Sequence, residues 1–405
     1  MPSPDFLVGS VSDGLPDAPG PAAAADGAVP ATVRDTGAPA VPGILTAADI
    51  LATGEQIAAL QEPSGAIGWP DGHTDAWNHV ECAMALSACG LTGAARRAYD
   101  WLRRTQRPDG SWPKRTVAEI AIDPAAESNQ AAYVAVGTWH EYLLTGDESF
   151  LAQMWPTVRR AIGFVLALQV PRGEIRWQRT ADGTPASYAL LTGCSSTYQS
   201  LRCAARLARH MGEPQPGWDL AASRLGHVIA CHPEAFADKS AFSMDWYYPV
   251  LAGPVRGPAA RDRLAAEWAE FVVAGLGVRC VRDEPWVTGA ETCELVMALD
   301  AVGDRARALQ VYAEVQHLRD SEGAYWTGWQ FANSAHFPAE RSSWTSAAMI
   351  LAADALSGTT PGSGLFRDAA AGMPASCPAD ALAGVPVSGP ADGQAACGCA
   401  VPAAG

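Results

Sequence analysis

The sequence predicts an all-α fold, a closed barrel of paired helices of the (α/α)6 type, and three observations support this. Between residues 46 and 357, apolar residues recur at helical spacing in about twelve segments. Gly, Pro and Asp separate these segments at intervals that suit short connections between helices. Few stretches alternate apolar and polar residues for long enough to form a sheet. Helices joined by short turns lie antiparallel, and about six such pairs can close into a ring with an inner and an outer layer.

The expected helices follow one another along the chain, and two boundaries show the physical signals that separate them. Gly146 can take the positive φ that ends a helix, and Asp147 offers a carboxylate to the free amides of the next one. Gly303 and Asp304 repeat this arrangement. The predicted helices are 46–61, 75–90, 93–106, 127–145, 147–169, 192–211, 216–231, 258–275, 288–302, 304–318 and 341–357, with a less defined one near 245–252.

Two segments of biased composition flank the helical region. Residues 1–43 and 359–405 consist mainly of Ala, Pro, Gly, Asp and Val without periodicity. Such segments cannot bury enough apolar surface to offset the entropy lost on ordering. We therefore expect a single barrel domain, residues 44–358, between two disordered tails.

The composition limits the classes of partner. A formal net charge of −15 disfavours nucleic acid, which needs clustered Lys and Arg, and it disfavours anionic membrane surfaces. No apolar run reaches the roughly 20 residues of a membrane span, and the first residues lack the features of a secretory signal. We expect a cytoplasmic protein that binds a small molecule or a glycan. The sequence does not indicate its oligomeric state.

The sequence predicts neither a metal ion nor another cofactor. His73 and His79 lie near Asp75 and Glu81, and the spacing would put Asp75 and His79 on one helix face, but a third convergent ligand is not evident. The chain also has neither a Gly-rich phosphate loop nor the nucleophile elbow of a serine hydrolase.

Three segments resemble one another, because each follows a helix, turns at Gly and presents Trp. They are Gln61-Glu-Pro-Ser-Gly65-Ala-Ile-Gly-Trp69, Gln106-Arg-Pro-Asp-Gly110-Ser-Trp112 and Gln316-His-Leu-Arg-Asp-Ser-Glu-Gly323-Ala-Tyr-Trp326. They indicate an internal repeat of helical hairpins. The arrangement resembles the repeats of squalene cyclases and protein prenyltransferases, which tie outer helices together and so imply the fold. The Asp-x-Asp-Asp motif of the cyclases does not occur, which disfavours polyene cyclisation.

A longer resemblance covers most of residues 65–357 and points to the six-hairpin glycosidases, particularly the bacterial glucoamylase and trehalase-like group. The segment from Trp69 to Leu86 is similar to that group's Trp-Pro-Arg-Asp-Ala segment. The group's Asp, which holds a sugar hydroxyl, corresponds to Asp75, while Thr74 replaces its Arg. Similar stretches follow in the same order at 106–112, 142–147 and 343–348. The resemblance implies glycoside hydrolase-like activity through paired carboxylates.

The candidate catalytic residues are Glu174, Glu291 and Glu340. Hydrolysis with inversion needs one protonated carboxyl and a second carboxylate. Where the glucoamylase group carries its acid, this chain has Gln178, which cannot supply a proton, so Glu174 is a substitute or else a solvated loop acid. Glu291, one turn before Glu294, and Glu340 are candidates for the second carboxylate. The alternatives are a surface pair favoured by the helix dipole and a helix cap, and the sequence does not separate them.

Helix starts and loops supply the candidate substrate-binding residues. The amides of Asn129 and Gln130 suit the donor and acceptor demands of sugar hydroxyls, and aromatic faces can stack on sugar rings. Capping around Ser128 and core packing of the aromatics are the alternative interpretations. The predicted binding residues are Trp69, Asp71, Asp75, Trp112, Glu127, Asn129, Gln130, Asp245, Trp246, Trp286, Trp326 and Trp344.

Three functions are compatible with these features. The first is hydrolysis of a glycan or glycoconjugate by paired carboxylates. The second is a prenyltransferase-like or terpene cyclase-like reaction on an isoprenoid, which the repeats and the aromatic residues would suit. The third is a barrel that binds a glycan without catalysis, since a fold does not guarantee a function.

Overall fold

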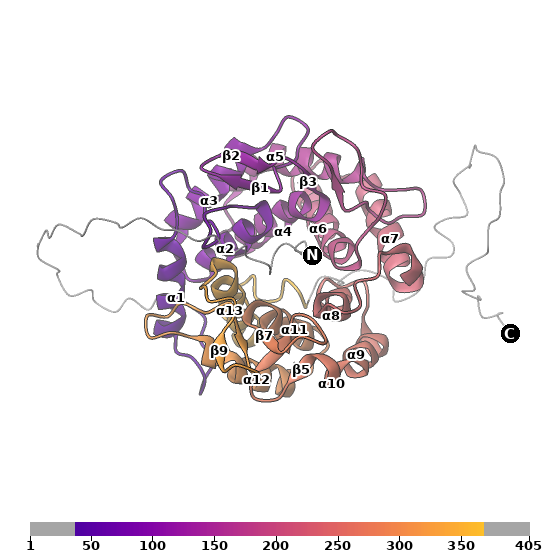
Figure 1. The fold of residues 1–405 in the computed structure, drawn as a ribbon. Coiled ribbons are helices and arrows are strands. Elements are labelled where there is room, and N and C mark those ends of the chain that lie inside the picture. Colours follow the sequence, from indigo (N-terminus) through magenta and orange to yellow (C-terminus); the bar gives the residue numbers. More distant parts are fainter. Residues whose placement is uncertain (1–36, 368–405) are drawn as a thin grey trace, which may run out of the picture.

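The structure, a computed structural model, describes residues 37–367 and shows a ring of six helical hairpins (Figure 1). Each hairpin has an outer helix followed by an inner helix, so the predicted (α/α)6 barrel is confirmed. The inner helices are α2 (Ala76–Ala88), α4 (Ser128–Thr145), α6 (Leu191–His210), α8 (Ser243–Leu251), α11 (Gly289–Ala301) and α13 (Ser343–Ser357). The outer helices are α1 (Ala47–Ala59), α3 (Thr92–Thr105), α5 (Glu148–Leu166), α7 (Pro216–Cys231), α9 (Gly257–Ala266), α10 (Trp268–Phe271) and α12 (Arg305–Glu314).

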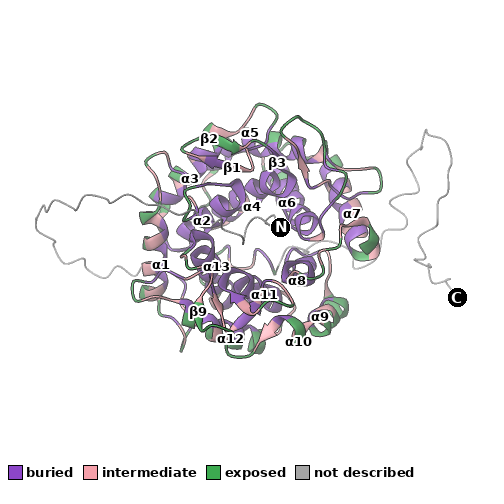
Figure 2. Cartoon of the chain, in the orientation of Figure 1, coloured by how far each residue is buried: buried purple, intermediate pink, exposed green. Residues whose placement is uncertain are grey.

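The two layers differ in composition because they bury different fractions of their surface. Every residue of α2 is buried, and the other inner helices are buried along almost their whole length (Figure 2). A helix surrounded by other helices must be apolar or internally paired on all sides. The outer helix α3 instead buries one face, which includes Tyr99 and Trp101, and exposes Arg103 and Arg104 on the other. None of the described helices is long and apolar enough to cross a membrane.

The two helix boundaries read from the sequence are confirmed. Gly146 ends α4 with φ of 61°, and the Asp147 carboxylate accepts the backbone N–H of Phe150 at 3.0 Å to cap α5. Gly303 has φ of 79°, and Asp304 caps α12 in the same way. These turns reverse the chain within a few residues, so each helix packs against the one that precedes it.

The connections also contain short strands, which the sequence did not predict. Segments of two to four residues carry too little alternation to be recognised. The strands are β1 (Arg115–Val117), β2 (Ile120–Asp123), β3 (Ala126–Glu127), β4 (Gln178–Arg179), β5 (Val272–Val273), β6 (Gly277–Arg279), β7 (Trp286–Thr288), β8 (Gly328–Gln330) and β9 (Ala335–His336). The last five form one antiparallel sheet in the order β5-β6-β7-β8-β9, and β1 pairs with β2 and β3 with β4. Two 3-10 turns, Pro233–Ala235 and Val315–Leu318, complete the connections.

The repeated Gln side chains tie each outer helix to the next. Gln61 Nε2 donates to the carbonyl oxygen of Gly65 in its own turn at 3.1 Å and to that of Ala94 in α3 at 3.0 Å. Gln106 makes the equivalent bonds to its own turn and to α5 at 3.0 and 2.9 Å. A further copy, not recognised in the sequence, begins at Gln169 and makes the same pair of bonds, to its own turn and to α7. The repeat therefore builds the outer ring.

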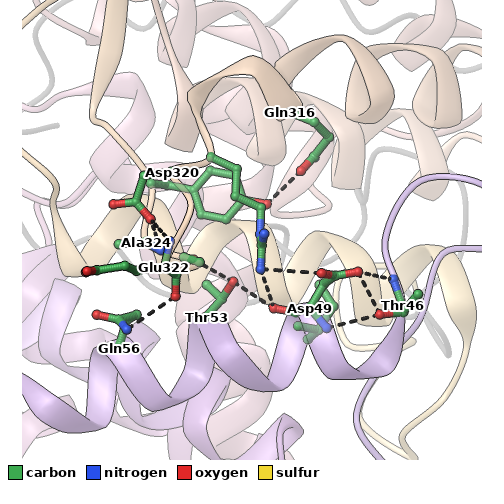
Figure 3. A network of polar contacts seen from close by, with 12 residues as sticks. Thr46, Asp49, Thr53, Gln56, Gln316, Asp320, Glu322 and Ala324 are labelled. Atoms are coloured by element: carbon green, nitrogen blue, oxygen red, sulfur yellow. Dashed lines mark hydrogen bonds and ion pairs between the residues drawn. The ribbon is translucent and has the colours of Figure 1, made fainter.

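The last copy of the repeat closes the ring on α1, as Figure 3 shows. In this copy Arg319 has the position that Gln61 and Gln106 have in theirs. The sequence alone suggests Gln316 for this position, three residues earlier. Arg319 Nη2 donates to the carbonyl oxygen of Asp49 at 3.1 Å. Thr53 Oγ1 of α1 donates to the carbonyl oxygen of Gly323 at 2.8 Å. The outer ring is thus closed by side-chain bonds between residues about 270 positions apart.

Residues 359–367, which the composition assigns to a tail, pack against the ends of the inner helices. Thr360 bonds to Asp354 of α13, and Arg367 Nη2 lies 2.7 Å from Asp300 Oδ2 of α11. Leu365 is buried. The described fold therefore extends beyond residue 358, and the outer parts of both predicted tails lie outside the described residues.

Candidate active site

The candidate functional side chains gather where the inner helices begin. The inner helices run in the same direction, so their first turns and the preceding loops meet at one end of the ring (Figure 1). Thr192 at the start of α6 bonds to Asp245 at the start of α8, and Ser343 at the start of α13 donates to Gly68 in the loop before α2. We call this cluster the rim site; it comprises Trp69, Asp75, Glu127, Asn129, Gln130, Asp245, Glu291 and Trp344.

Asp75 caps α2, and its carboxyl group accepts three hydrogen bonds. Its Oδ1 accepts the backbone N–H of Asn78 at 3.0 Å, and its Oδ2 accepts Trp69 Nε1 at 2.8 Å and Asn78 Nδ2 at 2.5 Å. Asp75 is buried, with 2% of its surface exposed. The three donors fix the orientation of this carboxyl group at the start of the helix.

Glu127 immediately precedes α4 and lies opposite Gln178 in the β3–β4 ladder. Its side chain is buried, and burial raises its pKa to about 7, while Lys114 lowers it. Lys114 Nζ lies 3.4 Å from Glu127 Oε1. A carboxyl group therefore sits beside Gln178, although the sequence offered none in that loop except Glu174.

Asn129 and Gln130 follow Glu127 in the first turn of α4, and both are buried. Neither Asn129 Oδ1 nor Asn129 Nδ2 has a hydrogen-bond partner among the described residues. The capping interpretation of this segment is not realised, because the Ser128 hydroxyl donates instead to the carbonyl oxygen of Trp177 at 2.9 Å. The amide of Asn129 is thus available to a ligand.

Glu291 lies in the first turn of α11 and is buried, so the interpretation of an exposed pair with Glu294 is wrong. Burial raises the pKa of Glu291, and contacts with Thr288 and Cys280 partly oppose this. Within residues 37–367, none of the groups that act on its charge is a cation, and Glu291 Oε2 has no hydrogen-bond partner. These conditions favour the protonated carboxyl.

Below the rim site lies a second pair of carboxyl groups that the sequence did not identify as site residues. Glu294 accepts hydrogen bonds from the hydroxyls of Tyr247 and Tyr248, the latter at 2.8 Å. Glu81 Oε1 accepts Trp77 Nε1 at 2.8 Å. Burial raises the pKa of Glu81 to about 7 and that of Glu294 well above its usual value. The available signal is a Glu in the second turn of each of two inner helices, α2 and α11.

Asp245 has a defined partner in the neighbouring inner helix. Its Oδ1 accepts the Thr192 hydroxyl at 2.6 Å and the Thr192 backbone N–H at 3.2 Å. Burial raises the pKa of Asp245, and these two bonds oppose the increase. Trp246, the next residue, points instead to the outer layer, where its Nε1 donates to the carbonyl oxygen of Arg263 and its ring stacks on Phe271.

The predicted aromatic residues divide into two groups. Trp112 and Trp246 are core residues, because each indole N–H donates to a helix carbonyl and the side chains are buried. Trp69 and Trp344 pack together at the rim site, with ring centroids 5.8 Å apart. At the edge of the rim site, Trp286 packs on Phe337, and Trp286 Nε1 has no hydrogen-bond partner among the described residues. The core-packing interpretation therefore applies to the first group.

Three predicted acids lie away from the rim site or at its margin. Glu174 follows the Gly of the Gln169 repeat, and Arg172 Nη2 lies 2.6 Å from its Oε1, so it belongs to an ion-paired turn. Asp71 is more than half exposed and pairs with His73 and Arg115. Glu340 is partly buried, and burial raises its pKa. Its capping interpretation is not realised, because Ser342 caps α13.

The rim site has the chemistry of a pocket for a neutral, hydroxyl-rich ligand. A buried polar atom without a partner costs about 1–3 kcal/mol, so such atoms are rare outside binding sites. Here they cluster around the starts of the inner helices. The buried atoms without a hydrogen-bond partner among the described residues include Asn129 Oδ1 and Nδ2, Gln130 Oε1, Trp177 Nε1, Gln178 Oε1, Trp286 Nε1 and Glu291 Oε2.

Comparison with known proteins agrees with this chemistry. No family profile matches the sequence. The chain is 57% identical over 330 residues to the MMP endo-(1,4)-3-O-methyl-alpha-D-mannosidase of Mycolicibacterium hassiacum, an alignment that covers 81% of this chain and 92% of that protein.

Solved structures of low sequence identity share the fold. A glycosidase variant in complex with glucose superposes with a TM-score of 0.62 at 16% identity, covering 78% of this chain and 98% of that one. A D-mannose isomerase gives 0.60 at 12% identity, with 77% and 96% covered. The cellobiose 2-epimerase of Spirochaeta thermophila gives 0.55 at 12% identity, with 76% and 95% covered.

Proposed function

We propose, from the premise that this chain belongs to the family of the Mycolicibacterium hassiacum endo-mannosidase, that it hydrolyses (1,4) bonds between 3-O-methyl-α-D-mannose units within a glycan. The glycoside hydrolase-like function in carbohydrate processing follows from family membership. Family membership therefore disfavours a reaction on an isoprenoid. The substrate and the residue roles below are our proposal.

The observation that carries the proposal is the contrast between two buried carboxyl groups at the rim site. Asp75 sits at a helix start, and its two oxygens accept three hydrogen bonds. Glu291 has an unpartnered oxygen, and burial raises its pKa. A glycosidase needs two carboxyl groups, one that donates a proton and one that acts as a carboxylate, and these two buried groups differ in their hydrogen bonding in the way that such roles require.

In this proposal Glu291 protonates the glycosidic oxygen as the bond to the anomeric carbon breaks. The Asp75 carboxylate stabilises the positive charge that develops on the sugar ring and takes a proton from the water that adds to the anomeric carbon. Glu127, held near Lys114, and the amide of Asn129 bind sugar hydroxyls. Glu127 is the less suitable proton donor, because the Lys114 ammonium stabilises its charged form.

The test is hydrolysis of a (1,4)-linked 3-O-methylmannose oligosaccharide, with the product lengths measured by mass spectrometry. Glu291→Gln and Asp75→Asn are expected to lower kcat by at least about 100-fold, the usual effect of losing acid-base catalysis. Glu174→Gln is the matched control and retains activity, because Glu174 is bound in an outer turn. A wild-type protein that cleaves none of these oligosaccharides would refute the proposed substrate.

A second substrate separates the two roles. An oligosaccharide with an aryl leaving group at the cleaved bond needs little protonation, so Glu291→Gln is expected to recover most of its lost rate on it, whereas Asp75→Asn recovers little. If Glu127→Gln is rescued by the aryl group and Glu291→Gln is not, Glu127 is the proton donor and the assignment of Glu291 is wrong.

A further inference from the structure

A cavity of about 420 Å³ lies beside the rim site, between α1, the loop before α2 and the loop before α13. Its size is within the range of pockets that hold small ligands, about 300–1,000 Å³. The residues that matter most to its chemistry are Gln56, Leu60, Trp69, Trp326, Glu340 and Ser346. The residue roles proposed above do not use this cavity.

Trp69 connects the cavity to the rim site. Its indole N–H donates to Asp75 Oδ2 at 2.8 Å, while the same side chain lines the cavity. A ligand in the cavity is therefore one indole away from the carboxylate that we assign to the reaction. An enzyme that cuts within a chain must bind sugar units on both sides of the cleaved bond, and this cavity adjoins the rim site through Trp69.

The cavity wall combines apolar and polar groups in a way that suits an O-methylated sugar. Leu60 is 52% exposed although it is a large aliphatic residue. Trp326 is held in one orientation by stacking on His336, with ring centroids 4.2 Å apart. Gln56 and Glu340 add hydrogen-bonding groups to the same wall. Leu60 and Trp326 can contact a methyl group and a ring face, while the amide and the carboxyl bind hydroxyls.

The outer wall of the cavity is built before any ligand binds. Gln56 Nε2 of α1 donates to the carbonyl oxygen of Glu322, and Thr53 Oγ1 donates to that of Gly323 (Figure 3). These bonds fix the turn that carries Ala324 and Trp326 against α1. A preformed wall costs little ordering entropy when a ligand binds.

We infer that this cavity is a subsite that binds a 3-O-methylmannose unit of the glycan next to the cleaved bond, with the methyl group against Leu60 and Trp326. The inference rests on the proposed function. It adds that the enzyme recognises the methylated sugar chain at a distinct place, formed by α1 and the loop before α13.

The experiment compares (1,4)-linked 3-O-methylmannose oligosaccharides of increasing length with unmethylated mannose oligosaccharides. For Leu60→Ala and Trp326→Ala, the ratio of kcat/KM for methylated over unmethylated oligosaccharides of the same length is expected to fall about tenfold, as for the loss of one aromatic or apolar contact. Ile120→Ala is the matched control, since Ile120 is 69% exposed on the β1–β2 hairpin and does not line the cavity. An unchanged ratio in both cavity variants would overturn the subsite.

Binding measurements separate failure of the subsite from failure of the proposed function. In a Glu291→Gln background, calorimetry is expected to show that Leu60→Ala weakens binding of the long methylated oligosaccharide but not of its unmethylated counterpart. Wild-type hydrolysis of the short substrate tests the proposed function alone. Equal affinities with and without Leu60→Ala would refute the subsite even if hydrolysis occurs.

Discussion

Gly110→Ala is expected to destabilise the protein strongly, because the turn of the repeat lies directly on the backbone of α5. Gly110 has φ of 94°, and a Cβ at this position would collide with the carbonyl group of Arg160. Holding Ala at such a φ costs about 1–3 kcal/mol. Moving the turn away also weakens the two bonds of Gln106, to Gly110 and to α5, each worth about 1 kcal/mol. The free energy of unfolding should therefore fall by about 3–5 kcal/mol.

Gly183→Ala isolates the backbone cost from the collision. Gly183 has φ of 87°, but a Cβ there would meet nothing within 4 Å. This variant should lose only the conformational part, about 1–2 kcal/mol. Urea unfolding followed by far-UV circular dichroism and Trp fluorescence measures both variants. A loss at Gly110 no larger than the loss at Gly183 would refute the argument that contact with α5 makes Gly110 necessary.

The remaining predictions concern buried ionisable groups. The Glu127 carboxyl has a folded-state pKa of about 7 against an ordinary value of 4.5, so this group alone should lower the free energy of unfolding by about 3 kcal/mol as pH rises through this window. Glu127→Gln should remove this loss, which urea unfolding at pH 5 and pH 8 measures. If the variant and the wild type lose the same stability between these pH values, the prediction is wrong. Lys114→Met should raise the folded-state pKa of Glu127, because Lys114 lowers it in the wild type, and the loss of stability should then extend to higher pH. A loss that ends at lower pH would contradict this prediction. Tyr248→Phe should cost about 1–3 kcal/mol, because Glu294 loses a buried donor; unchanged thermal unfolding would show that the bond contributes no net stability.

The architecture could be predicted because many independent local signals agree. Helical periodicity, the Gly and Asp pairs at 146–147 and 303–304, and short connections each act within a few residues, and the structure repeats them around the ring. The strands could not be predicted for the opposite reason. β3 and β4 are two residues long, and their pairing depends on how two distant loops meet above the barrel.

The repeat shows how a correct motif can still give an incorrect alignment. The sequence suggested Gln316 as the partner of Gln61 and Gln106, but Arg319 occupies that position in space. A guanidinium and an amide both donate to a helix carbonyl, so the structure accepts either, whereas a comparison of residue types does not. Glu174 was selected as a candidate acid because its place in the unrecognised Gln169 repeat was not apparent.

The site could be predicted only in part, because its residues converge through the direction of the inner helices and not through proximity in sequence. Asp75, Glu127 and Glu291 each stand at a helix start, which a helix dipole favours even on a surface, so residue type and local pattern cannot separate a catalytic acid from an ordinary first-turn acid. The structure shows that all three are buried, unlike an ordinary first-turn acid on a surface. Gln178 illustrates the same point. Its loop lacks the expected acid, but the β3–β4 ladder places Glu127 opposite Gln178. A carboxyl group therefore reaches this region from the start of another helix. The absence of an acid from one loop is therefore weak evidence against catalysis in a barrel whose site is assembled from five helix starts.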